Sequence, residues 1–176
     1  RAYKKWRHLD FESVESPVER DDVDLIAEAR REIDHPVSEH IRSEEYAIRV
    51  IKARAVDIFN ISITVAGGIQ AMLRLFHIAR AASLECLIGT TQELSVATAA
   101  QAHVGAAVES LDYASDPVGP ALYQADVVRQ RVRFEAGELV VPEGPGTGME
   151  VDRAMIRAIE GRLSAANDVK SQYVRG

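Results

Sequence analysis

Short apolar runs recur along this chain at a nearly constant interval, and each run ends on a polar or small residue. The interval is about 25 residues, which is the length that a strand, a helix and two short loops need. Repeated units of this kind form a parallel sheet with right-handed crossovers, and functional residues gather at the carboxyl ends of its strands. The four runs end at Glu15, His40, Ser62 and Gly89. We therefore expect an α/β fold in which these four positions lie near one another.

Hydrophobic periodicity and helix-start signals divide the chain into alternating strands and helices. Strands are predicted over 11–15, 36–40, 57–64 and 84–88, with a fifth near 110–113, and helices over 22–33, 43–52, 68–82 and 92–108. A β-hairpin over 132–141, a loop rich in proline and glycine over 142–148 and a helix over 152–167 follow. We expect residues 1–126 to form a partial barrel and residues 127–176 a C-terminal tail.

The composition argues against several classes of protein. The chain has 176 residues and a net charge of −6, with acids and bases mixed along it, which argues against a nucleic-acid interface and a basic membrane-surface helix. No apolar run approaches the roughly 18 residues of a membrane span, and the N-terminus lacks a signal-peptide core. The expected location is therefore the cytoplasm. The single cysteine, Cys86, excludes an internal disulfide and a cysteine-based zinc site, and we interpret it as a small core residue.

The length matches part of a barrel. The chain begins without methionine and inside a helical pattern over 2–9, which indicates a fragment or a processed chain. A closed eight-stranded (β/α) barrel needs roughly 200–250 residues, so the remaining strands must come from elsewhere.

Three blocks of the sequence resemble the enolase superfamily, and within it the mandelate racemase/muconate lactonizing enzyme group. The blocks are 11–17, then 57–62 with 66–69, and then 137–142 with 144–148. The resemblance implies the C-terminal part of a modified TIM barrel, strands four to eight, followed by a hairpin tail that returns to a missing N-terminal capping domain. It also implies a homo-oligomer, and a need for the N-terminal portion of the same protein.

The resemblance implies a reaction class as well. A divalent metal, usually Mg²⁺, binds the carboxylate of a small-molecule substrate, a base removes the proton alpha to it, and the metal stabilises the enediolate. Dehydration of a sugar acid or hydroxy acid is slightly favoured, which makes the chain part of a lyase. Cycloisomerisation and racemisation are the alternatives within the same superfamily.

Two positions correspond to metal ligands in the resemblance. Glu15 matches the second ligand, whereas the alternative for it is a solvated glutamate before a turn. The third ligand falls on Glu39 or His40, and adjacent strand residues point to opposite faces, so one of them faces the barrel mouth. His40 has the expected spacing after Pro36, but nitrogen is a weaker match for Mg²⁺ than oxygen. The first ligand belongs to a strand upstream of this chain.

The remaining candidates follow the later strands. Ser62 takes a position where the family carries a catalytic lysine or aspartate, and serine is a poor base without an activating partner. Gly89 falls where racemase-like members place a histidine, so the bases expected on one face of the substrate are absent. A reaction with one base, using an upstream lysine, remains open.

The resemblance yields two groups of candidate site residues. The candidate catalytic residues are Ser62, Glu93 and Asp116, and the candidate substrate-binding residues are His40, Gly89 and Thr90. Glu93 is also typical of an acid that the helix dipole favours at a helix start. The sequence thus leaves two hypotheses open. One is a Mg²⁺-dependent enzyme that needs its N-terminal portion, and the other is a non-catalytic chain.

Overall fold

Four short parallel strands, in the order of the sequence, form the central sheet. The computed structural model describes residues 2–19, 21–109 and 111–162. The strands are β1 (Val14–Glu15), β2 (Val37–His40), β3 (Ile58–Ile61) and β4 (Glu85–Ile88), and each pairs with the next. The predicted α/β fold and its strand–helix interval are confirmed, because all four runs contain a strand.

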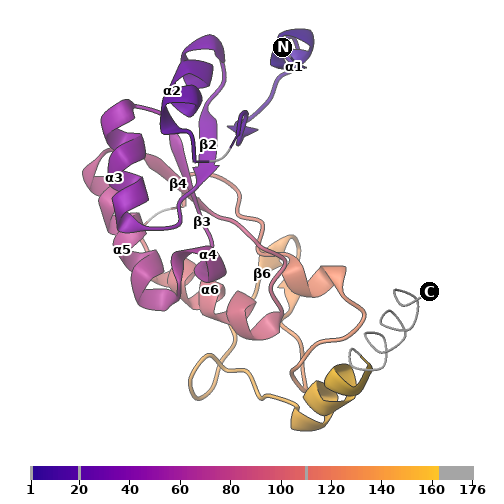
Figure 1. The fold of residues 1–176 in the computed structure, drawn as a ribbon. Helices are drawn as coiled ribbons and strands as arrows, with labels where there is room; N and C mark the ends of the chain where they lie inside the picture. Colours follow the sequence, from indigo (N-terminus) through magenta and orange to yellow (C-terminus); the bar gives the residue numbers. More distant parts are fainter. Residues whose placement is uncertain (1, 20, 110, 163–176) are drawn as a thin grey trace, which may run out of the picture.

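Helices connect the strands and follow one another along one side of the sheet (Figure 1). They are α2 (Val23–Glu32), α3 (Glu44–Ala53) and α5 (Ile69–Ala81), with α6 (Ser95–Ala107) after β4. Polar side chains start two of them: the carboxylate of Asp22 accepts a hydrogen bond from Leu25 N at 2.9 Å, and the Ser43 hydroxyl accepts one from Tyr46 N at 3.1 Å. Caps of this type satisfy backbone N–H groups that the helix itself leaves free.

The core lies between the sheet and these helices. Phe59 and Ile61 of β3 belong to the buried cluster that the helices cover, whereas Ile58 and Asn60 do not. Alternate strand residues point to opposite faces, so Asn60 lies on the face turned away from the helices. Cys86 is buried in this core, and burial raises the pKa of its thiol to about 12, which fits the inert packing role predicted for it.

The third strand ends earlier than predicted. Residues from Ile63 onward form the short helix α4 (Ile63–Ala66) instead of continuing β3 to residue 64. The side-chain oxygen of Gln101 accepts a hydrogen bond from Ile63 N at 2.8 Å, and Gly67 closes the turn with a φ of 92°. The hydrogen bond from this distant side chain and the glycine turn outweigh the strand preference of β-branched residues, since β propensity depends strongly on context.

The predicted fifth strand is wrong for residues 111–113, which have no strand structure. The segment still runs beside β4, because Asp112 N and Asp116 N each donate a 3.0 Å hydrogen bond to a carbonyl of that strand. Two side chains of this segment accept hydrogen bonds from the strand in return. Cys86 N donates to Asp112 Oδ2 and Ile88 N donates to Ser115 Oγ, both at 2.9 Å. Asp and Ser side chains compete with backbone acceptors in this way, so no regular ladder forms.

The C-terminal segment contains a short antiparallel hairpin, formed by β5 (Phe134–Glu135) and β6 (Glu138–Leu139) after the 3₁₀ helix η1 (Gly119–Leu122). Ala136 and Gly137 both have positive φ, as a tight two-residue hairpin turn requires. Residues 153–162 are helical, and the rest of the predicted final helix lies outside the described residues. The return of this tail to a capping domain and the boundary at residue 126 remain predictions.

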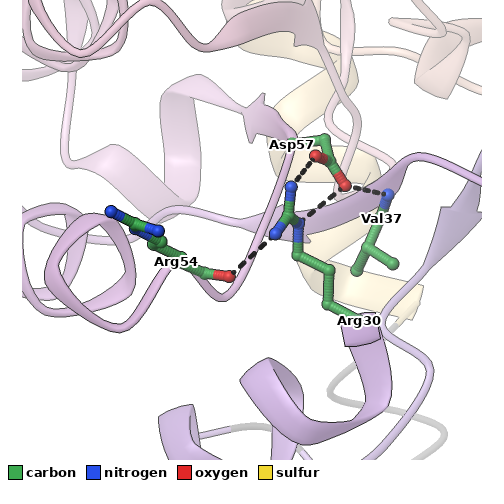
Figure 2. A network of polar contacts seen from close by, with 4 residues as sticks. All are labelled: Arg30, Val37, Arg54 and Asp57. Atoms are coloured by element: carbon green, nitrogen blue, oxygen red, sulfur yellow. Dashed lines mark hydrogen bonds and ion pairs between the residues drawn. The ribbon is translucent and has the colours of Figure 1, made fainter. Parts of the chain in front are cut away.

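An ion-pair network joins two strands at their amino-terminal ends. Arg30 Nε donates to Asp57 Oδ2 at 3.0 Å, a second guanidinium nitrogen bonds Asp57 Oδ1, and Val37 N donates to Asp57 Oδ2 at 3.0 Å (Figure 2). Arg30 also reaches the carbonyl of Arg54 at 3.3 Å. The network lies at the end of the sheet opposite to the candidate site.

In the described residues, no helix is both long and apolar enough to cross a bilayer.

Candidate functional site

Glu15 and His40 form a close pair at the carboxyl ends of β1 and β2. His40 Nε2 lies 2.6 Å from Glu15 Oε1. The imidazole side chain is only 16% exposed, whereas the carboxylate is 49% exposed and lies at the rim. The parallel register explains this contact, because Glu15 pairs with Ser38, and His40 follows Ser38 by two residues on the same face.

Glu39 points away from this pair, although it is adjacent to His40 in the sequence. Its Oε1 accepts hydrogen bonds from Ser16 Oγ at 3.0 Å and from His40 N at 2.8 Å. The residue is 1% exposed, and its second oxygen has no hydrogen-bond partner among the described residues. Burial, followed by the charge of Glu39, raises the pKa of Tyr46. Of the two residues considered for the third metal position, His40 is therefore the one beside Glu15.

Ser62 and Gly89 are both closed off from the site. Ser62 is completely buried, and its hydroxyl has no hydrogen-bond partner in the described part of the chain. Gly89 is covered by the side chain of Asn60, which occupies the place where a Cβ at position 89 would project. Asn60 is 3% exposed and pairs in register with His40, so it lies between two candidate binding residues.

Replacing Gly89 by alanine is expected to destabilise the fold by about 1–2 kcal/mol, because the new Cβ would lie 2.7 Å from Cγ of Asn60 and displace its amide. Chemical denaturation of Gly89→Ala, Asn60→Ala and the double variant measures the coupling between the two positions. The double variant should lose less stability than the sum of the single variants. Additive losses would show that the two side chains do not compete for this space.

Glu93 organises the loop that follows β4. Its Oε2 accepts hydrogen bonds from Thr90 Oγ1 at 2.9 Å, Thr91 N at 2.7 Å and Thr91 Oγ1 at 3.3 Å. The side-chain amide of Gln101 donates a hydrogen bond to Oε1 of Glu93, and Glu93 is only 8% exposed. With both oxygens bonded inside the protein, Glu93 is placed to position Thr90 and is not free to act on a ligand.

Asp116 is the acid whose ionisation the site alters most clearly. Burial raises its pKa above the ordinary value of 3.8, and the charges of Glu15 and, more weakly, Glu93 raise it further. A backbone hydrogen bond within the residue and the charge of His40 oppose this shift without reversing it. Asp116 therefore holds a proton more readily than an exposed aspartate does.

A cleft opens at these strand ends. Two predicted binding residues, His40 and Thr90, line it together with Glu39, Arg42 and Gln92. The sequence reasoning missed Arg42, which lies 4.0 Å above the ring of Tyr46, as well as Asn60 and Gln101. A polar amide inside an apolar strand or an alanine-rich helix was the available signal for Asn60 and Gln101.

The donors of this chain do not fit Mg²⁺, the cofactor that the resemblance implies. Mg²⁺ requires a near-octahedral set of oxygen ligands. The donors that meet here are the Glu15 carboxylate and the His40 imidazole, and they are bonded to each other. In the ranges that the structure describes, no group of three or more His, Cys, Asp or Glu side chains could hold a metal ion.

Comparisons with known proteins agree on one family. Residues 1–155 match the family model described as enolase C-terminal domain-like. Muconate cycloisomerase 1 of Rhodococcus opacus is 28% identical over 148 residues, which cover 83% of this chain and 40% of that protein. N-succinyl-L-Arg/Lys racemase of Bacillus cereus is 29% identical over 160 residues, which cover 90% of this chain and 42% of that protein.

Solved structures give the same result for the fold. The crystal structure of N-succinyl Arg/Lys racemase from Bacillus cereus matches with a TM-score of 0.82 at 28% identity, over 89% of this chain and 42% of that one. The structure of 2-chloromuconate cycloisomerase from Rhodococcus opacus matches with a TM-score of 0.79 at 30% identity, over 83% and 40%. The chain thus spans about 40% of the length of the relatives that it matches.

Proposed function

The chain belongs to the enolase C-terminal domain-like family, in the mandelate racemase/muconate lactonizing enzyme group of the enolase superfamily, and on this premise we propose that it forms part of an isomerase acting on a small carboxylate. The relatives named above are cycloisomerases and a racemase, so isomerisation takes precedence over the dehydration that the sequence slightly favoured. Since the chain spans less than half of these relatives, the complete activity needs the N-terminal portion of the same protein.

One observation carries the proposal. Glu15, His40, Thr90 and Asp116 all lie at the carboxyl ends of the strands, the location of active sites in barrels of this type. A raised pKa makes Asp116 a candidate proton donor in the reaction. Thr90, held by Glu93, is a candidate ligand contact through its hydroxyl.

The neutral ends of β3 and β4 support a reaction with a single base. Ser62 is sealed and Gly89 carries no side chain, so neither provides a base on this side of the ligand. The base would come from the N-terminal portion. Racemisation through two bases, one on each face of the ligand, is therefore less consistent with this site than cycloisomerisation is.

A non-catalytic chain that binds a carboxylate is the second candidate, because the same two positions lack any ionisable group. For the complete protein we further propose a cytoplasmic location and a homo-oligomeric state, as the family resemblance implies. No step of the proposed reaction is assigned to a metal, since the donors of this chain do not fit Mg²⁺.

The test uses the complete protein with cis,cis-muconate and N-succinyl-arginine as probes, because relatives act on these types of compound by name. Product formation and exchange of the alpha proton in D₂O are followed by NMR. Asp116→Asn is expected to lower kcat by about 10²–10⁴-fold, the usual contribution of a general acid, whereas Val96→Met on the exposed face of α6 should not. Binding of the probes without turnover and without exchange of the alpha proton would favour the non-catalytic chain instead.

A further inference from the structure

We infer that His40 takes the place of a divalent cation at these strand ends, so that the site of this chain is a carboxylate–imidazole pair and not a Mg²⁺ site. The inference rests on the proposed assignment of the strand ends as the ligand site. Its starting point is the 2.6 Å contact between His40 Nε2 and Glu15 Oε1. A bound cation would need to approach the carboxylate oxygen that the imidazole already occupies.

The hydrogen on His40 faces the wrong way for a metal ligand. An ionised carboxylate only accepts hydrogen bonds, so Nε2 carries the hydrogen in its contact with Glu15. To bind a metal through Nε2, the ring would have to give up that hydrogen and with it the contact with Glu15. Nδ1 is buried and has no hydrogen-bond partner among the described residues.

Histidines that ligate metals almost always donate their second N–H to a carboxylate, a carbonyl or water. Loss of such a partner typically weakens metal binding by about 10- to 100-fold. His40 has no acceptor of this kind at Nδ1 among the described residues, so its surroundings favour the bond to Glu15 over coordination of a metal.

The neighbouring acids do not compensate. Glu39 Oε1 accepts hydrogen bonds from Ser16 Oγ and His40 N, whereas its buried Oε2 has no hydrogen-bond partner among the described residues. As the strand neighbour of His40, Glu39 projects from the opposite face of β2. Glu93 accepts hydrogen bonds from Thr90, Thr91 and Gln101 through both of its oxygens. Asp116 remains as the additional carboxylate that interacts with Glu15. Because Mg²⁺ in proteins is often held by one or two carboxylates and several waters, the decisive feature is the contact of Glu15 with His40 and not the number of acids.

The experiment titrates the complete protein with Mg²⁺ alone, by isothermal calorimetry and by the shift of the melting temperature. Wild-type protein should show no saturable binding that depends on Glu15, up to about 10 mM Mg²⁺. His40→Asp replaces the imidazole by an oxygen ligand and removes the hydrogen that faces Glu15. It should bind Mg²⁺ saturably below about 10 mM, where wild type shows no such binding.

Two further variants make the result decisive. Glu15→Gln in the His40→Asp background should abolish the Mg²⁺ binding that His40→Asp gains. His40→Asn also offers an oxygen ligand, and it replaces His40→Asp in the test if that variant folds poorly; it should bind Mg²⁺ more weakly than His40→Asp but more tightly than wild type. Saturable Mg²⁺ binding by wild-type protein that Glu15→Gln removes would overturn the inference. Failure of both His40 variants to gain binding, with circular dichroism showing that they fold, would overturn it as well. These outcomes are independent of isomerase activity, so the proposed function can fail while this inference stands.

Discussion

Replacing Gln101 by methionine is expected to lower the free energy of unfolding by about 2–5 kcal/mol, because two buried polar groups would lose their partners. Gln101 is fully buried in α6. Its Oε1 accepts the hydrogen bond from Ile63 N at 2.8 Å, and its Nε2 donates to Glu93 Oε1. Methionine fills a similar volume, so the loss reflects hydrogen bonding more than packing.

Urea denaturation of Gln101→Met gives the free energy directly, and two variants control it. Val96→Met introduces the same side chain at an exposed position of α6 and should change stability by less than about 0.5 kcal/mol. Gln101→Glu keeps an acceptor for Ile63 N but offers no donor to Glu93, so it separates the two bonds. A loss under 1 kcal/mol for Gln101→Met would mean that water replaces both bonds.

Replacing Asp57 by alanine is expected to cost about 2–4 kcal/mol at pH 7, because it leaves the half-buried guanidinium of Arg30 and the N–H of Val37 without this partner. The network joins α2 to the starts of β2 and β3 (Figure 2). Glu28→Ala, an exposed change on the same helix as Arg30, is the matched control. Thermal and urea unfolding of both variants test the difference.

The effect should depend on pH. Burial alone would raise the pKa of Asp57, but the hydrogen bond from Arg30, the N–H of Val37 and the charge of Arg30 outweigh it and lower the pKa below its ordinary value of 3.8. A lowered folded-state pKa adds stability above the unfolded value and loses it as the pH falls through the folded value. The gap between wild type and Asp57→Ala should therefore be complete at pH 7 and shrink below about pH 4. A gap that is constant down to pH 2 would contradict this assignment.

The regular parts of the fold follow from local signals in the sequence. Strand intervals, the caps Asp22 and Ser43, and the apolar faces of the helices all depend on residues that are close in sequence. The failures at Ile63 and at 111–113 have a different origin. In both places the backbone bonds to a side chain or strand that is distant in the sequence. Hydrophobic periodicity reflects only neighbouring residues, so it does not predict such a partner.

Some features of the site can likewise be predicted from the sequence, and others cannot. The position of His40 beside Glu15 follows from register on neighbouring parallel strands, which the spacing of the runs already implied. The bonding of Glu93 does not follow, because its acidic side chain at a helix start is equally typical of a dipole interaction. Gln101 lies in α6, eight residues after Glu93, and supplies the amide that holds it. The sequence alone does not indicate that these two residues meet.

The packing of Asn60 over Gly89 also constrains how this site can change over time. A side chain cannot appear at position 89 until residue 60 has become smaller or has turned aside. In the reverse order, the new side chain would collide with the amide of Asn60. Introducing a reactive group at the end of β4 therefore calls for a smaller residue at position 60 as well, so two coordinated substitutions are needed instead of one.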